Sequence, residues 1–223
     1  MKAPALGIDI GGSGIKFGLI DIDSGEMIAD RFKIDTPQPS TPDAVAAAIR
    51  DAISELGWKG DKIGVGFPAI IVDGVSLSAA NIDKAWIGTN VEELLHRYTG
   101  HKYYVINDAD AAGVAERMYG RINHIKGTVL LLTLGTGIGS ALFNDGSLIP
   151  NTEFGHIQYK GDIAENWVSN RARKERTLDY DTWAMELAEF LDYMILLLSP
   201  RLIVLGGGIS FRFDEFAHHF NHL

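Results

Sequence analysis

The sequence contains no cysteine, and this absence excludes two kinds of construction. Without thiols the chain can form neither a disulfide framework nor a thiolate zinc site, and it suits the reducing cytoplasm, where we expect it to work. The sequence also lacks any run of the ~18 apolar residues that a membrane helix needs. Its first apolar run is broken by Asp9, which is unlike a signal peptide. We therefore expect no membrane partner.

Positive charge is also scarce. The 223 residues include 20 lysines and arginines against 29 aspartates and glutamates, which gives a net charge of -9. An acidic chain repels a phosphate backbone, so no nucleic-acid partner is expected. The hydrophobic fraction of 46% is enough for a full core. Together these values favour a globular protein that acts on small molecules.

The apolar pattern predicts an α/β protein. Strands are expected at 5–10, 15–21, 27–34, 62–67, 102–106, 127–134, 138–143 and 202–205, and the first three form an antiparallel meander. Helices are expected after an N-cap at Asp43, at 91–98, at 109–118, over a long apolar face that ends before Pro200, and from Ser210. Residues 68–90 look irregular.

Two turns between strands combine glycine with a hydroxyl group. They hold Gly11, Gly12, Ser13 and Gly14 in GIDIGGSGIKFGL, and Gly135, Thr136 and Gly137 in LTLGTGIGSAL. Neither is a dinucleotide fingerprint or a Walker A motif, because Phe17 takes the place of the third glycine and no glycine directly precedes a lysine. The amides of such turns can bind phosphate. The alternative is that each is only a tight turn.

Asp9 stands where a strand should be apolar. A carboxylate there can serve a phosphate-bound Mg²⁺, because magnesium prefers one or two protein oxygens together with phosphate and water. The alternative is a polar strand end. Lys16 can neutralise a transferring phosphate. Alternatively it is a solvated strand residue, because strand alternation places its side chain on the other face of the strand from Ile15 and Phe17.

Asn107 and Asp108 lie where a predicted strand becomes a helix, which is where open α/β sheets place working groups. Asp108 can cap the helix, and it can also accept a proton from an alcohol that attacks phosphorus. Glu153 and His156 flank Phe154 and Gly155; they suit a polyol, or they form a surface pair without the spacing of a zinc protease. Asn81 and Glu165 are polar loop residues that can add further contacts.

Five motifs in this order resemble the ROK family of sugar kinases in the actin-like ATPase superfamily, most closely its branch of polyphosphate glucokinases and glucomannokinases. The motifs are DIGGSGIK (9–16), NDADAAGVAE (107–116), LTLGTGIGSAL (132–142), IPNTEFGHI (149–157) and VLGGGIS (204–210). The resemblance implies an α/β, actin-like (ribonuclease H-like) two-lobe fold with a central cleft. The expected lobes are a small one at 1–107 and a larger one at 108–223.

The resemblance also implies a kinase that transfers a phosphoryl group from polyphosphate or ATP to the 6-hydroxyl of glucose, with mannose as an alternative acceptor. Asp108 is then the general base, and Asp9 serves Mg²⁺ through phosphate and water. The implied hexose ligands are Asn81, Asn107, Asp108, Glu153, His156 and Glu165. The implied phosphate-binding residues are Asp9, Gly11, Gly12, Ser13, Gly14, Lys16, Gly135, Thr136, Gly137, Gly207 and Gly208. A cytoplasmic homodimer is expected.

Departures from the family pattern favour particular alternatives. Many members carry a cysteine-rich zinc motif after the Gly-His pair, but GHIQYKGDIAENW has none, so no zinc is expected. Family repressors begin with a helix-turn-helix, whereas here a strand is expected within a few residues of Met1. Relatives also continue beyond the position of Leu223, which favours a sugar-binding sensor without kinase activity, although Asp9, Asp108 and both turns oppose it. An actin-like ATPase or acid kinase is opposed by the sugar loop.

A basic cluster offers a further hypothesis about the phosphoryl donor. It comprises Arg171, Arg173, Lys174 and Arg176, within six residues of sequence otherwise poor in positive charge. Such a cluster can follow a polyanion outside the cleft. The alternative is a solvated linker, which is the usual environment of a run of charges.

Overall fold

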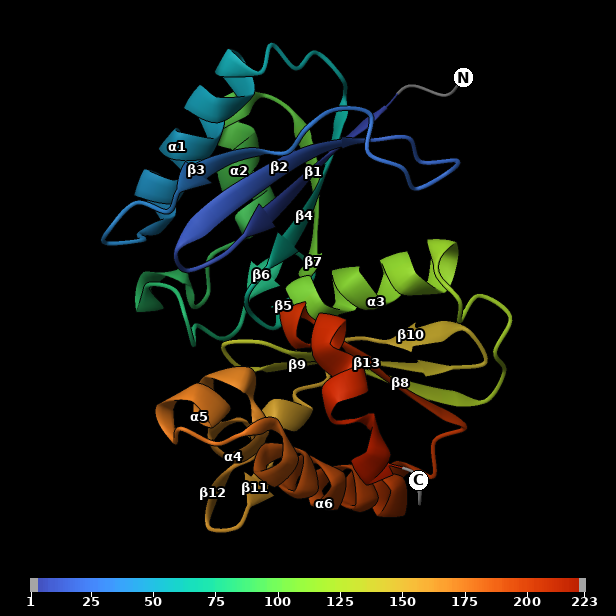
Figure 1. Cartoon of the computed structure of the whole chain (residues 1–223). Helices are drawn as coiled ribbons and strands as arrows, with labels where there is room; N and C mark the ends of the chain where they lie inside the picture. The colour runs from blue at the N-terminus through green and yellow to red at the C-terminus, as the bar shows by residue number, and fades with distance from the viewer. Residues whose placement is uncertain (1–3, 221–223) are drawn as a thin grey trace. The chain divides into compact units, whose positions relative to one another are not determined.

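The chain divides into two compact units, Met1–Tyr119 and Gly120–Leu223, and the computed structural model describes residues 4–220 (Figure 1). The lobe boundary was expected after Asn107, but the compact units divide after Tyr119. The reason is that helix α3 (Asp108–Tyr119) packs on strands β4 (Lys62–Phe67) and β7 (Lys102–Asn107) of the first unit. Asp108 is therefore part of the first unit.

The first unit is built on a five-stranded sheet in the order β3-β2-β1-β4-β7. Its other strands are β1 (Ala5–Ile10), β2 (Gly14–Ile20), β3 (Phe32–Asp35) and the small pair β5 (Ile71–Val72) and β6 (Val75–Ser76). Its other helices are α1 (Pro42–Glu55), η1 (Lys84–Trp86) and α2 (Val91–Thr99). The predicted antiparallel meander of β1, β2 and β3 is confirmed, and β1, β4 and β7 run parallel.

Strand alternation gives the sheet of the first unit two different faces. Leu6, Ile8 and Ile10 of β1 point into the core that α1 and α2 cover, whereas Gly66 of β4 lies on the opposite face, against α3. Because β1, β4 and β7 are parallel, their carboxyl ends meet at one edge of the sheet. The first glycine turn follows β1 at this edge, and Asp108 follows β7.

The second unit has a four-stranded sheet in the order β10-β9-β8-β13, in which β8 and β13 run parallel. Its strands are β8 (Thr128–Leu134), β9 (Ile138–Asn144), β10 (Ser147–Ile149), β13 (Leu202–Gly206) and the small pair β11 (Gln158–Tyr159) and β12 (Asp162–Ile163). Its helices are η2 (Phe154–His156), α4 (Glu165–Val168), α5 (Asn170–Glu175), α6 (Tyr180–Leu198), η3 (Gly208–Glu215) and η4 (Ala217–Phe220). Among the described residues no helix is long and apolar enough to cross a membrane.

Two of the predicted helix starts are wrong. Asp43 was expected to cap α1, but the cap residue is Thr41, because Pro42 at the first helical position fixes the start. A final α-helix was expected from Ser210, but the chain forms the 3₁₀ segments η3 and η4 instead. The three-residue repeat of a 3₁₀ turn keeps Phe213 and Phe216 in edge contact.

Trp86 holds the linker between β3 and α1 (residues 36–41) against the core of the first unit. Its side chain is fully buried and its Nε1–H donates to the Ser40 carbonyl oxygen at 2.9 Å. Its ring meets the edge of Phe67 at 4.8 Å between centroids. The linker is thereby held at the same end of the sheet as the first glycine turn, since Phe67 is the last residue of β4.

We predict that Trp86→Phe lowers the free energy of unfolding by about 1–3 kcal/mol, because a buried carbonyl loses its donor. Trp58→Phe is the matched control, since the Trp58 Nε1 atom is buried without a hydrogen-bond partner among the described residues. Urea unfolding followed by circular dichroism should show the larger loss for Trp86→Phe. Equal losses for the two variants would contradict the role given to the hydrogen bond.

Candidate active site

The first glycine turn is closed by its own backbone. The Gly11 N–H donates to the Gly14 carbonyl oxygen at 3.0 Å, and Gly14 is buried as the first residue of β2. Both were expected to bind phosphate. In the structure Gly11 uses its amide within the turn and Gly14 joins the sheet, so these two residues shape the turn.

The linker after β3 orients the peptide planes of this turn. The Thr36 hydroxyl donates to the Gly11 carbonyl oxygen, and the Gln38 side-chain amide donates to the Gly12 carbonyl oxygen at 3.1 Å. In a trans peptide the N–H points opposite to the C=O of the same plane. The N–H groups of Gly12 and Ser13 therefore point away from the linker, as an anion cradle requires.

Asp9 and Lys16 form a cross-strand ion pair. They are register partners on β1 and β2, and the Lys16 Nζ lies 2.7 Å from the Asp9 Oδ2. Both side chains are about half exposed, so the pair is accessible to a charged ligand. This position fits a role of Asp9 and Lys16 in binding Mg²⁺ and phosphate, and it also fits a polar, solvated end of the strands.

Gly66 lets the start of α3 pack close to β4. It is the register partner of Asp9 on one side and of Ile106 on the other. A Cβ atom at Gly66 would lie 3.5 Å from the Asp108 Cα atom, so any larger side chain would press on Asp108. Sequence reasoning missed Gly66, although a glycine inside a buried strand often marks such a close approach.

Asn107, and not Asp108, caps helix α3. The buried Asn107 Oδ1 accepts hydrogen bonds from the backbone N–H groups of Ala109 and Asp110, at 2.9 and 3.1 Å. Its Nδ2 donates to the Ala69 carbonyl oxygen at 3.1 Å. The capping alternative for Asp108 is therefore wrong. Asp108 is the first helical residue, is exposed, and its Oδ1 accepts from the N–H of Ala109 at 2.8 Å.

A hollow of about 300 Å³ lies beside the first turn. Asn81 faces it, and Gly12 allows the turn to approach the Asn81 loop, since a Cβ there would lie 2.5 Å from the Asn81 carbonyl oxygen. The Ser40 hydroxyl accepts from the Asp83 N–H at 3.1 Å and joins the two walls. The lining residues are Gly12, Gln38, Pro39, Ser40, Ala80, Asn81, Ile82 and Asp83. The volume suits a small polar ligand.

The second glycine turn repeats the construction of the first. The Gly135 N–H donates to the Gly137 carbonyl oxygen at 3.0 Å, and the Gly135 carbonyl oxygen accepts from the Arg171 N–H at 3.1 Å. By the same geometry of the peptide plane, the N–H of Thr136 points away from Arg171. The exposed Thr136 hydroxyl lies on the same residue.

Glu165 lies against the second turn. Its Oε2 accepts from the Ile138 N–H at 3.3 Å, and its Oε1 lies 3.6 Å from the Arg171 Nη2. A Cβ on Gly137 would come within 2.4 Å of the Glu165 carboxylate, so any other residue there would displace that carboxylate from the turn. Glu165 was expected to bind a sugar hydroxyl, and the structure adds contacts that support the turn.

The loop that carries Glu153 and His156 is fixed to the start of β9. The buried Ser140 hydroxyl donates to the Thr152 carbonyl oxygen at 2.6 Å and accepts from the Phe154 N–H at 3.1 Å. Gly155 has no room for a Cβ, which would lie 2.4 Å from the Ile138 carbonyl oxygen. The His156 Nδ1 lies 3.1 Å from the Glu153 Oε2. The expected pair therefore exists and lies beside the second turn.

Gly207 brings the last glycine motif (204–210) beside the second glycine turn. It follows β13, whose register partner is β8, and it has a positive φ of 84°. A Cβ there would lie 2.8 Å from the Leu134 carbonyl oxygen, immediately before the second turn. Around Gly208 there is open space. The structure thus collects the predicted residues of the second unit at the carboxyl ends of β8 and β13.

The basic cluster directs most of its charge into the unit itself. Arg176 makes two hydrogen bonds to Glu186, at 2.6 and 2.7 Å, which raise the pKa of Arg176. Arg173 donates to the Leu178 carbonyl oxygen at 3.1 Å and lies over the Tyr180 ring. Lys174 is exposed on α5. The segment begins as the helix α5 and is not a linker, and its three arginines make contacts within their own unit.

Sequence reasoning missed Thr36 and Gln38, which support the first glycine turn, and Ser140, which holds the loop of Glu153 and His156. Arg171 was assigned to the basic cluster, and its backbone support of the second turn was missed. Thr36 and Gln38 carried a signal, because polar residues in a proline-marked linker often hydrogen-bond to nearby backbone. The Ser140 contacts and the backbone contact of Arg171 carried no signal, because they depend on the packing of distant segments.

Comparison with known proteins places these features in a family. Residues 5–170 match the ROK family. The chain is 44% identical, over 95% of its length and 80% of the relative, to a polyphosphate glucokinase of Mycobacterium tuberculosis. The crystal structure of an inorganic polyphosphate/ATP-glucomannokinase from Arthrobacter sp. strain KM matches 99% of this chain and 89% of that chain, with 46% identity and a TM-score of 0.93. A ROK family glucokinase from Streptomyces griseus, solved with glucose and AMPPNP, shares the fold at 23% identity and a TM-score of 0.82.

We predict that Gly12→Ala destabilises the first unit by about 1–3 kcal/mol, because the added methyl group meets the Asn81 backbone and the turn must move. Gly64→Ala is the control, since the space around that strand glycine is open. Denaturant unfolding should show a loss for Gly12→Ala alone. An unchanged midpoint for Gly12→Ala would refute the close approach of the turn to the Asn81 loop.

Proposed function

The chain belongs to the ROK family, and from this premise we propose that it is a kinase that transfers a phosphoryl group from polyphosphate or ATP to the 6-hydroxyl of glucose, with mannose as an alternative acceptor. Its α/β sheets have the actin-like ATPase fold of that family. The observation that carries the proposal is the similarity to proteins named for this activity over nearly the whole chain.

The phosphoryl donor is bound mainly by main-chain amides. The N–H groups of Gly12, Ser13 and Thr136 point away from the contacts that hold their turns, which supports a role as anion donors. The hydroxyls of Ser13 and Thr136 add donors beside them. Lys16 supplies a positive charge, and Gly208, held beside the second turn by Gly207, offers open backbone for the far end of the donor.

Asp108 takes the proton of the sugar 6-hydroxyl as this oxygen attacks phosphorus. Its position at the start of α3 supports the role, because a helix N-terminus stabilises a carboxylate anion. Asn107 fixes the backbone that carries Asp108 by capping the helix and by its bond to Ala69. Because Gly66 has no side chain, no larger group presses on Asp108 from β4.

Polar side chains supply the proposed contacts to the hydroxyl groups of the hexose. In the first unit, the position of Asn81 on the 300 Å³ hollow supports a sugar contact, and Asn107 retains a second amide hydrogen for one. In the second unit, Glu153 and His156 form a pair that both accepts and donates hydrogen bonds. Glu165 completes the set while it supports the second turn.

The residues present fit a magnesium ion. Asp9 offers an exposed carboxylate at the carboxyl end of β1, next to the first turn, and Mg²⁺ needs only one or two such oxygens together with phosphate and water. When bound, the ion would draw negative charge from the phosphate oxygens. The Lys16 ammonium donates to the Asp9 carboxylate at 2.7 Å and holds it in place.

We expect the enzyme to act in the cytoplasm as a homodimer. The outward face of α6 supports the dimer, because it exposes the apolar side chains of Met185, Tyr193, Leu196 and Leu197. Met185 and Leu196 are about three helical turns apart and therefore lie on one stripe. A second copy of the chain would cover this stripe.

The proposed activity is tested directly with purified protein, glucose and either ATP or long-chain polyphosphate, and formation of sugar 6-phosphate is followed in a coupled assay. Product with either donor supports the kinase. Glucose binding without product would overturn it in favour of a sugar-binding sensor. Donor hydrolysis that does not depend on hexose would favour an actin-like ATPase.

We predict that Asp108→Asn lowers kcat by about two to four powers of ten while glucose binding is retained, because only the proton acceptor is lost. The control is Asp51→Asn, which removes an exposed carboxylate whose described ion pair is with its neighbour Arg50. Steady-state rates and glucose titration calorimetry measure the two effects separately. A loss in kcat under about threefold would remove Asp108 from the role of base.

We predict that Leu196→Asp converts the dimer to a monomer, because a buried charge without a partner costs more than the contact gains. Leu77→Asp is the control, since Leu77 is another exposed leucine, located in the first unit. Sedimentation velocity measures the oligomeric state. A wild-type monomer, or a dimer that survives Leu196→Asp, would contradict the proposed interface.

A further inference from the structure

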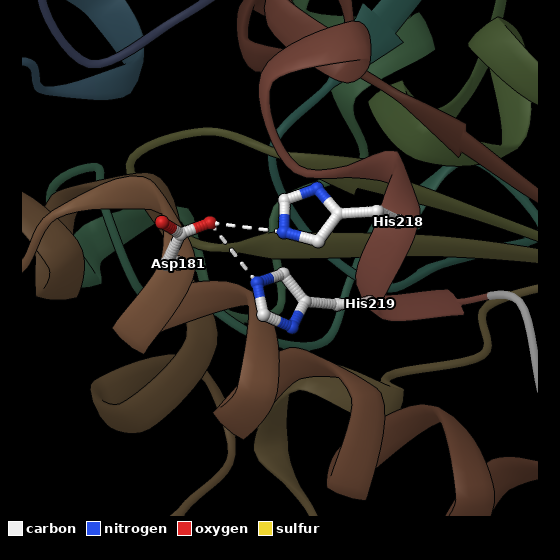
Figure 2. A group of neighbouring side chains, drawn as sticks. All are labelled: Asp181, His218 and His219. Carbon is white, nitrogen blue, oxygen red and sulfur yellow. Dashed lines mark hydrogen bonds and ion pairs between the residues drawn. The ribbon is translucent and has the colours of Figure 1, made fainter.

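The beginning of α6 and the segment η4 bring one carboxylate and two imidazoles together (Figure 2). The Oδ1 atom of Asp181 lies 3.2 Å from the Nε2 of His218 and 3.0 Å from the Nε2 of His219. The two rings lie side by side, with centroids 4.1 Å apart. Figure 2 shows both rings turning a nitrogen toward the same carboxylate oxygen.

Aromatic packing holds the two segments in this arrangement. Phe216 is buried, stacks on Tyr180 at 5.9 Å and meets the edge of Trp183 at 5.2 Å. Phe220 meets the edge of Phe216 at 5.9 Å. Tyr180 directly precedes Asp181, and Phe216 and Phe220 flank the two histidines in sequence. The backbone of all three polar residues is therefore anchored before any ligand binds.

Two carboxylates lie near the start of α6, and they have different tasks. Asp179 is the N-cap and accepts from the Thr182 N–H at 2.8 Å, a bond that lowers the pKa of Asp179. Asp181 takes no part in that cap and faces the imidazoles. Its side chain is 64% exposed, and those of His218 and His219 are 59% and 19% exposed, so an ion can reach all three from solvent.

We propose that Asp181, His218 and His219 bind one divalent transition-metal cation of the Zn²⁺ class through Oδ1 and the two Nε2 atoms. Zinc bonds to nitrogen are about 2.0–2.1 Å long, so tetrahedral ligand atoms lie about 3.3 Å apart. Two of the three separations already have this size, and all three ligand atoms lie within 4.8 Å of one another. Water completes the coordination. Imidazole ligands disfavour Mg²⁺ and Ca²⁺.

This site is distinct from the sugar kinase chemistry and from the zinc motif that the sequence lacks. The expectation of no zinc followed from the missing thiolates, whereas these ligands are imidazole and carboxylate groups elsewhere in the chain. A bound ion would link α6, through Asp181, to η4, through His218 and His219. Because an ion that binds only the folded state stabilises it, the second unit gains stability.

The test is a zinc titration of the full chain, prepared without a polyhistidine tag, against a chromophoric chelator. We expect one Zn²⁺ per chain, and a loss in affinity of at least about tenfold in the double variant His218→Ala, His219→Ala and in Asp181→Asn. His124→Ala is the matched control, since His124 is an exposed histidine whose Nδ1 lies 2.9 Å from the Asn123 Oδ1. Excess Mg²⁺ should leave the affinity for Zn²⁺ unchanged.

Thermal unfolding provides a second measurement that does not depend on kinase activity. Zn²⁺ should raise the unfolding midpoint of the wild type and of His124→Ala, but not that of the double variant. Circular dichroism verifies that the variants fold, which we expect because the substituted side chains reach solvent. No zinc binding by the wild type would overturn the proposal. So would binding that survives in the double variant, or that depends on His222, which lies outside the described residues.

Discussion

The orientation of a few peptide planes is the constraint on which the proposed donor site depends. In both glycine turns the carbonyl oxygens are held from one side, by Thr36 and Gln38 at the first turn and by the Arg171 backbone at the second. Because carbonyl and amide point in opposite directions in a trans peptide, each of these contacts aims an N–H the other way. The turns therefore present donors without any side chain of their own. Glycine is needed at Gly12, where the turn meets the Asn81 backbone, and at Gly137 it leaves room for the Glu165 carboxylate.

This construction explains how an acidic protein can hold a polyanion. The net charge is -9, and the arginines of α5 are engaged with Glu186, Tyr180 and the backbone of their own unit. Free positive charge is scarce, so the proposed donor binding would depend on fixed amide dipoles together with Lys16 and a metal ion. Amide dipoles lose little on desolvation compared with a charged side chain, and they need no reorganisation as negative charge develops on phosphate. A polyphosphate chain and a nucleotide triphosphate present the same terminal groups to such a cradle.

The parts of this structure that repeat a local pattern could be predicted from sequence, and the parts that depend on distant contacts could not. Strand 62–67 and the buried face of α6 follow from the spacing of apolar residues, and the structure confirms both. Asp43 was wrongly chosen as a cap because Pro42 overrides it, and the aromatic side chains of the last described segment favour 3₁₀ turns over the expected helix. For the candidate site, the sequence predicted which residues take part but not the contacts that hold them in position. Its supports, such as Ser140 and Gly66, become visible only when distant strands are paired.

The division of labour between Asn107 and Asp108 shows why the order of these two residues matters for the proposed chemistry. A helix start needs an acceptor for its first amides, and a general base needs a carboxylate that can reach the substrate. If the aspartate were the cap, its oxygen would be occupied by two backbone donors and its side chain would be buried. The neutral Asn107 meets that need instead, with both donors on its Oδ1 and its amide held by Ala69. Asp108 then occupies the next position, exposed to solvent at the positive end of the α3 dipole, as the proposed base requires. If the two residues were exchanged, an aspartate at position 107 would bury a charge at the helix cap. An asparagine at position 108 would leave the proposed reaction without a proton acceptor.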